Sequence, residues 1–71
     1  MLRLDDEVRF KGYKGRWYVI GKTTWRGKRY YLFESTIWGD EAPAIITDET
    51  GKVLLDDVYN GFDDLREALD W

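Results

Sequence analysis

Polar and apolar residues alternate through most of this chain, and glycines interrupt the alternation at short intervals. A period of two is typical of strands with one buried face, whereas a helix repeats at about 3.6 residues. The pattern predicts strands at roughly 7–12, 16–24, 29–36, 44–47 and 52–58. The segment at roughly 62–70 changes to the helical period, with Phe62, Leu65 and Leu69 on one face, and it predicts a short helix.

The glycines indicate where the chain turns. Gly12 and Gly15 bracket a tight turn, and Arg26-Gly27 forms the centre of a predicted hairpin. Gly21 lies inside the second strand, where a glycine predicts a bulge or the close approach of another part of the chain. The irregular stretch 37–43 ends at the single proline and is expected to be a loop.

Five short sequential strands with one apolar face tend to curl into a small barrel. We therefore expect a mainly β fold of order β-β-β-β-β-α. In it, a small five-stranded antiparallel SH3-like open barrel carries a short C-terminal helix, as one domain over residues 1–71. The helix is too short to be stable alone and should dock on the sheet, with Asp63 or Asp64 capping its free amides. The initial methionine and the terminal helix favour a complete chain.

The composition argues against catalysis. The 71 residues include no cysteine and no histidine, which removes disulfides, thiolate metal sites and the usual general base. No phosphate-binding glycine loop occurs, and adjacent carboxylates such as Asp56 and Asp57 point to opposite faces of a strand. We expect a protein that is not an enzyme and that has no cofactor and no metal site, with twelve aromatic residues stabilising its small core.

No apolar run is long enough for a secretion signal or for a membrane span of about 20 residues. The absence of cysteine also suits a reducing compartment. The sequence therefore predicts a cytoplasmic protein that does not associate with membranes.

The charged residues are sorted along the chain. Residues 8–29 contain eight basic residues and no acid, whereas residues 30–71 contain eleven acids and two bases. This division predicts either a binding face for an anionic partner or two halves that fold against each other. The order and register of the strands decide between these alternatives.

The basic half also contains aromatic residues, which is the pattern of a surface that neutralises phosphates and stacks on unpaired bases. The candidate nucleic-acid-binding residues are Arg16, Trp17, Trp25, Arg26, Lys28 and Arg29. The sequence pI near 4.8 argues against this hypothesis, because domains that bind nucleic acid are usually basic.

A protein partner is the favoured alternative. The predicted loop places Trp38 beside Asp40 and Glu41, and loops on a rigid scaffold often carry recognition. The aromatic content exceeds what a five-stranded core can hide, so Trp25 and Tyr59 are further candidate contact residues. We expect a monomer, or a weak dimer that pairs through an edge strand.

Two resemblances add to these expectations. Residues 8–19 (VRFKGYKGRWYV) resemble the first hairpin of KOW and SH3-like domains. The segments YYLFES, WGDEAP and LDDVYNGFDDL resemble small proteins carried by phages and conjugative elements of Gram-positive bacteria, a group that implies no particular activity. The leading hypothesis is thus a non-catalytic protein-interaction module of a mobile genetic element. One specific form is an acidic anti-defence protein that imitates nucleic acid.

Overall fold

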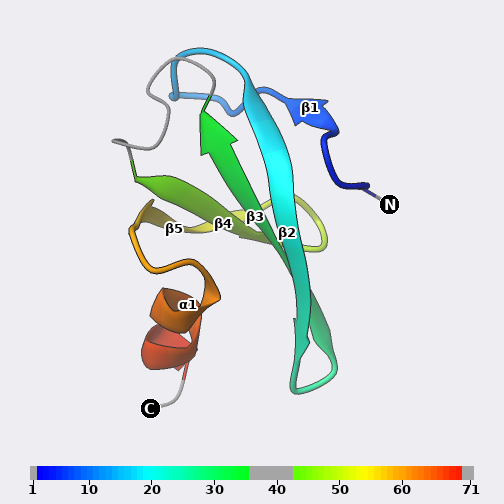
Figure 1. Cartoon of the computed structure of the whole chain (residues 1–71), viewed down its shortest axis with the longest axis vertical. Coiled ribbons are helices and arrows are strands. Elements are labelled where there is room, and N and C mark those ends of the chain that lie inside the picture. The colour runs from blue at the N-terminus through cyan, green and yellow to red at the C-terminus, as the bar shows by residue number, and fades with distance from the viewer. Residues whose placement is uncertain (1, 36–42, 70–71) are drawn as a thin grey trace.

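The computed structural model describes residues 2–35 and 43–69. These residues form one antiparallel sheet and a C-terminal helix (Figure 1). The elements are β1 (Glu7–Val8), β2 (Trp17–Trp25), β3 (Lys28–Ser35), β4 (Ala44–Asp48), β5 (Val53–Val58) and α1 (Phe62–Leu69). The order β1-β2-β3-β4-β5 across the sheet is the order along the chain. The predicted mainly β fold, with five antiparallel strands and a short terminal helix, is confirmed.

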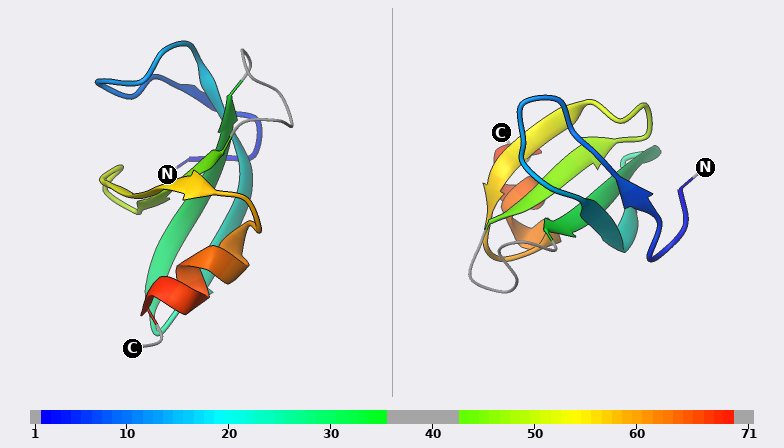
Figure 2. Two further views of the ribbon diagram at one scale, coloured as in Figure 1. Left: turned by 90° about the vertical axis from the view of Figure 1, so that its left-hand side faces the viewer. Right: turned by 90° about the horizontal axis from the view of Figure 1, so that it is seen from above.

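The sheet curls into a half-barrel and is covered on both faces (Figure 2). The segment before β2 crosses one face, where the inner cluster has a buried centre of Trp17, Val19, Tyr31, Phe33 and Ile45. Helix α1 covers the other face, where the helix cluster has a buried centre of Tyr30, Ile46, Val58 and Leu65. Since neighbouring residues on a strand point to opposite faces, Tyr30 and Tyr31 enter different clusters.

The first strand is much shorter than predicted, because it ends at Val8 rather than near residue 12. The chain leaves the sheet edge there and brings Phe10 over the inner cluster. The Phe10 ring makes edge-to-face contacts with Phe33, at 4.9 Å between centroids, and with Trp17, at 6.1 Å. Gly12 then turns the chain with a φ of +89°. Aromatic packing therefore replaces strand pairing at this point.

The hairpin between β2 and β3 forms where it was predicted. Arg26 and Gly27 both have positive φ values, 53° and 80°, so the turn is of type I′. Trp25 pairs with Lys28 directly before and after this turn. The two-residue turn fixes the register of the whole hairpin.

Gly21 has the role that its position in the second strand predicted. The register of β2 against β3 shifts between Val19 and Gly21, which marks a β-bulge. The ring of Phe62 lies over this bulge, and a Cβ added to Gly21 would lie 3.1 Å from its Cε2 atom. The absence of a side chain lets the start of α1 approach the sheet.

Asp64 stabilises the entry to α1. Its carboxylate accepts hydrogen bonds from the backbone N–H groups of Tyr59, at 2.9 Å, and Asn60, at 3.2 Å. The backbone hydrogen bond from Tyr59 is the main reason that the pKa of Asp64 lies below its ordinary value. The sequence predicted that Asp63 or Asp64 would cap helix amides. Asp64 instead binds two amides that precede the helix.

Candidate functional site

The charge division along the chain becomes a charge division across the sheet. Because each strand pairs with its chain neighbour, β2, with Lys22 as its one charged residue, lies near one edge, and β5, with Asp56 and Asp57, forms the other. The cations of the basic half nevertheless have two different environments, at the two ends of β2.

Near the start of β2, Arg16 pairs with an acid of the N-terminal segment, and Tyr13 contacts an acid of the last strand. The Nε atom of Arg16 lies 3.1 Å from Oε1 of Glu7. The hydroxyl of Tyr13 donates a hydrogen bond to Oδ2 of Asp56, in β5, at 2.6 Å. This hydrogen bond raises the pKa of Tyr13 above its ordinary value. Here the two halves of the chain fold against each other.

The far end of β2 and the start of β3 form a hairpin whose own charged residues are all basic. Residues 22–29 contain no carboxylate, and the four basic side chains of this basic hairpin are all exposed: Lys22, Arg26, Lys28 and Arg29. The neighbouring strand contributes Asp48 opposite Tyr30. The Asp48 carboxylate accepts hydrogen bonds from the backbone N–H groups of Thr50, at 2.8 Å, and Lys52, at 3.0 Å. This acid is therefore engaged in its own turn.

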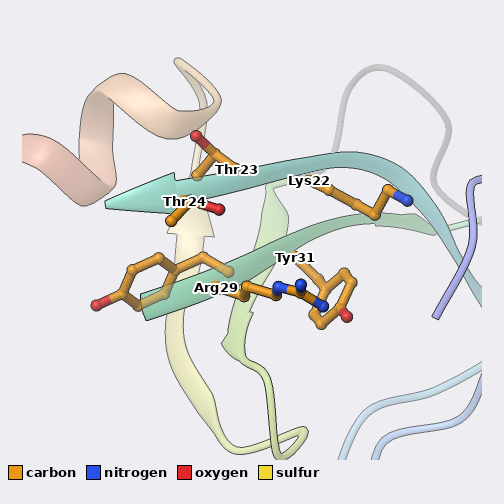
Figure 3. Close-up of a pocket in the computed structure, with 6 residues that line it drawn as sticks. Lys22, Thr23, Thr24, Arg29 and Tyr31 are labelled. Atoms are coloured by element: carbon orange, nitrogen blue, oxygen red, sulfur yellow. The ribbon is translucent and has the colours of Figure 1, made fainter. Parts of the chain in front are cut away.

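A pocket of about 500 Å³, called the hairpin pocket below, opens beside the basic hairpin. Its lining residues are Lys22, Thr23, Thr24, Arg29, Tyr30 and Tyr31 (Figure 3), and none of them is acidic. The register pairs Lys22 with Tyr31 and Thr24 with Arg29, which places these four side chains on one face of the sheet. In Figure 3 the side chains of Lys22 and Arg29 extend from adjacent strands in the same direction. Two cations beside hydroxyl groups provide suitable groups for binding an anion.

Trp25 lies on the opposite face, against the helix cluster. Its ring centroid is 5.4 Å from the guanidinium carbon of Arg26 and 5.7 Å from that of Arg66, in α1. These distances are within the range of cation–π attraction. Its indole N–H is buried without a hydrogen-bond partner among the described residues. Trp25 therefore joins the hairpin to the helix rather than presenting an open stacking surface.

Comparison with models of protein families assigns the chain to a family. The model of large polyvalent protein-associated domain 18 matches residues 2–69. The chain belongs to this family. Membership of a family associated with polyvalent proteins is consistent with the predicted mobile-element module, whereas the resemblance to KOW and SH3-like domains is not confirmed. No curated protein and no solved structure was found to match the chain.

The structure divides the residues proposed for nucleic-acid binding in this domain-18 chain. Arg26, Lys28 and Arg29 all lie at the tip of the basic hairpin, but only Arg29 lines the pocket described above. Lys28 pairs with Trp25 and lies on the opposite face, where Trp25, Arg26 and Lys28 line a second, smaller pocket. Trp17 is only 5% exposed in the inner cluster, so its ring is not available for stacking on a base. Arg16 lies next to Trp17, at the other end of β2.

The residues proposed for a protein partner are not brought to one place. Trp38, Asp40 and Glu41 lie outside the described residues. Tyr59 is 68% exposed directly before α1, whereas Trp25 lies beside Arg66, later in that helix.

The candidate set from the sequence did not include Thr24 and Tyr31, and it placed Lys22 only on the strand beside the hairpin. The signal that could have found them is the two-residue turn at Arg26-Gly27. Counting back from that turn pairs Thr24 with Arg29 and Lys22 with Tyr31, which puts them beside one of the candidate cations.

No helix in residues 2–35 and 43–69 has the length and apolar character needed to cross a bilayer. Within the same residues, no group of three or more acidic side chains is placed to hold a metal ion.

Proposed function

We propose that this domain is a non-catalytic interaction module that holds an anionic partner, most favourably an acidic segment of another protein, on its basic hairpin. The observation that carries the proposal is the hairpin pocket, where Lys22 and Arg29 line a cavity and none of the described lining residues is acidic. A patch of one sign attracts partners of the opposite sign and accelerates their encounter. A module of this kind suits a family associated with large polyvalent proteins.

Nucleic acid is the second candidate partner. The combination of lysine, arginine and hydroxyl groups in the pocket also suits a phosphate group. Single-stranded nucleic acid, however, is usually held by stacked aromatic side chains as well as by cations. Trp17 is buried and Trp25 is flanked by two guanidiniums, so the aromatic part of such a site has less support.

The hypothesis of an acidic surface that imitates nucleic acid has less support than an acidic protein partner or a nucleic-acid partner. Three of the carboxylates that motivated this hypothesis accept hydrogen bonds within the domain: Asp48 in its turn, Asp56 from Tyr13, and Asp64 before α1. Their positions are accounted for by the fold itself.

A charge-reversal experiment tests the proposed function. Lys22→Glu combined with Arg29→Glu reverses the charge of the two cations that line the hairpin pocket. Lys11→Glu combined with Lys14→Glu makes the same change in net charge at exposed positions before β2. Binding of labelled polyglutamate and of labelled single-stranded DNA is measured by fluorescence anisotropy at about 50 and about 200 mM salt.

We expect polyglutamate to bind the wild-type domain more tightly than DNA does. The hairpin variant should lose at least about tenfold in affinity, equivalent to about 1.4 kcal/mol. The control variant should change affinity by less than about threefold, because screened charges away from the site act weakly. Equal losses in both variants, or no binding to either probe, would refute the proposal.

A further inference from the structure

The basic hairpin has an open strand edge. Strand β1 pairs with β2 only at Trp17 and Tyr18. The backbone of Val19 still reaches the N-terminal segment, through hydrogen bonds to Asp5 and Asp6 at 2.8 and 3.0 Å. Beyond it, Ile20 lies in the bulge and residues 21–25 of β2 pair with β3 on one side, and no other described strand pairs with them on the outer side. In Figure 1 this part of the hairpin extends well past β1.

The register shows which backbone groups face outward. In a two-residue hairpin the pair next to the turn, here Trp25 and Lys28, exchanges hydrogen bonds. Hydrogen-bonded and non-hydrogen-bonded pairs then alternate along an antiparallel ladder. Thr24 and Lys22 belong to the non-hydrogen-bonded pairs, so their N–H and C=O groups point away from β3. Another extended segment could bind to these groups.

The side chains at this edge select the kind of segment. Lys22 and Thr24 lie on the face that carries the hairpin pocket, with Arg29 on the next strand. A strand added beside β2 would place alternate side chains over this face. Carboxylates at those positions would lie beside Lys22. Ile20, which is 46% exposed, offers an apolar contact at the start of the same edge.

A second copy of this chain fits the edge poorly. Pairing two β2 edges would bring cations of one hairpin against cations of the other, and like charges across strands are destabilising. A lysine and a bulge at an edge are features that prevent such self-pairing. The edge of β2 therefore disfavours pairing with the same edge of a second copy and favours a segment of opposite charge.

We infer that the outer edge of β2, at residues 20–25, takes up an extended acidic segment of a protein partner as an additional strand, with its carboxylates over Lys22 and the hairpin pocket. This mode of recognition combines main-chain hydrogen bonds with side-chain selection. The inference rests on the proposed function and specifies the partner that the basic hairpin holds.

The test uses the full chain and two short synthetic peptides of alternating glutamate and valine. The second peptide has N-methyl groups on the amides that would face β2, so its charge is unchanged but its strand pairing is blocked. Binding is measured by anisotropy, and exchange of the Lys22 and Thr24 amide protons by NMR. A single-stranded oligonucleotide serves as the third probe.

We expect the unmodified peptide to bind at least about tenfold more tightly than the N-methylated one, with slower exchange at both amides. Thr24→Pro removes one outward N–H group and should weaken binding to a similar extent, whereas Thr24→Ala should not. A proline is tolerated at an edge where the N–H group faces solvent, so the hairpin should remain folded.

The outcomes separate the two proposals. Equal, salt-sensitive binding of both peptides would overturn strand addition and leave the anionic partner intact. The same conclusion would follow if the oligonucleotide bound more tightly than the unmodified peptide. Loss of all binding in the Lys22→Glu, Arg29→Glu variant, together with the effect of N-methylation in the wild type, would support both proposals.

Discussion

The hydroxyl of Tyr13 donates a hydrogen bond to the carboxylate of Asp56 across 43 positions of the sequence. Tyr13 lies in the segment between β1 and β2, and Asp56 lies in β5, so the contact joins the first part of the chain to the last strand. The sheet remains an open ladder, and this bond holds its curl where no strand pairing does among the described residues. Two rings of the inner cluster, Phe10 and Trp17, support the position of Tyr13 by edge contacts.

Tyr13→Phe should destabilise the domain at neutral pH, because it removes this hydrogen bond and keeps the ring contacts. The hydrogen bond raises the pKa of Tyr13 above 10.0 in the folded protein. Its contribution is therefore complete below pH 10.0 and is lost as the pH rises through the folded-state pKa. Urea denaturation should show a difference between wild type and variant that closes at high pH. Tyr59→Phe, at an exposed ring, is the control. A difference that persists at high pH contradicts this account.

Asp64→Asn should lower stability at neutral pH, because the amide oxygen replaces a carboxylate that accepts two backbone hydrogen bonds. These bonds hold the pKa of Asp64 below 3.8. The contribution is thus present above pH 3.8 and is lost as the pH falls through the folded-state pKa. Thermal unfolding between acid and neutral pH measures this effect. Asp63→Asn makes the same charge change at an exposed position in the same turn, and an equal effect of both variants would show that only net charge matters.

Gly21→Val should weaken the docking of α1. A side chain at this bulge would overlap the ring of Phe62, and overpacking of this kind typically reduces stability by about 1–3 kcal/mol. Chemical denaturation followed by circular dichroism would measure the loss. Ile20→Val, at the exposed neighbouring position, should change stability by less than about 0.5 kcal/mol. If Gly21→Val is no more destabilising than this control, the close approach is not required.

Arg66→Gln should reduce stability by about 0.5–1 kcal/mol, the range for cation–π contacts at exposed sites. Arg66 is one of two guanidiniums beside the Trp25 ring, and it is the one that comes from α1. Arg66→Lys keeps the positive charge and should retain most of the stability. Denaturant midpoints of the three proteins decide the matter. A lysine variant as unstable as the glutamine variant would point to lost packing rather than to the charge.

The parts of the fold that depend on local chemistry could be predicted from the sequence. Arg26-Gly27 identified the hairpin, and Gly21 identified the bulge, because each of these positions imposes its own backbone requirement. The change of hydrophobic period at Phe62 identified α1.

The parts that depend on tertiary packing could not be predicted. Nothing around Phe10 indicates that its ring would leave the strand for Phe33, and nothing links Tyr13 to Asp56 before the sheet has curled. Trp17 and Trp25 have similar sequence surroundings, yet one is in the inner cluster and the other lies beside two arginines. Because these tryptophans are packed against the fold, the candidate nucleic-acid site of the sequence is a cationic pocket in the structure and not an aromatic stacking surface.

The neighbour-to-neighbour order of the strands has a consequence for how the domain forms. Every ladder joins consecutive strands, so each hairpin can close over a short loop, and folding that relies on local contacts is fast. During synthesis β2 and β3 can pair before β4 and β5 leave the ribosome. The bond between Tyr13 and Asp56 can form only when β5 has emerged. Most of the sheet can therefore form from contacts that are local in the sequence, with this one long-range bond added last.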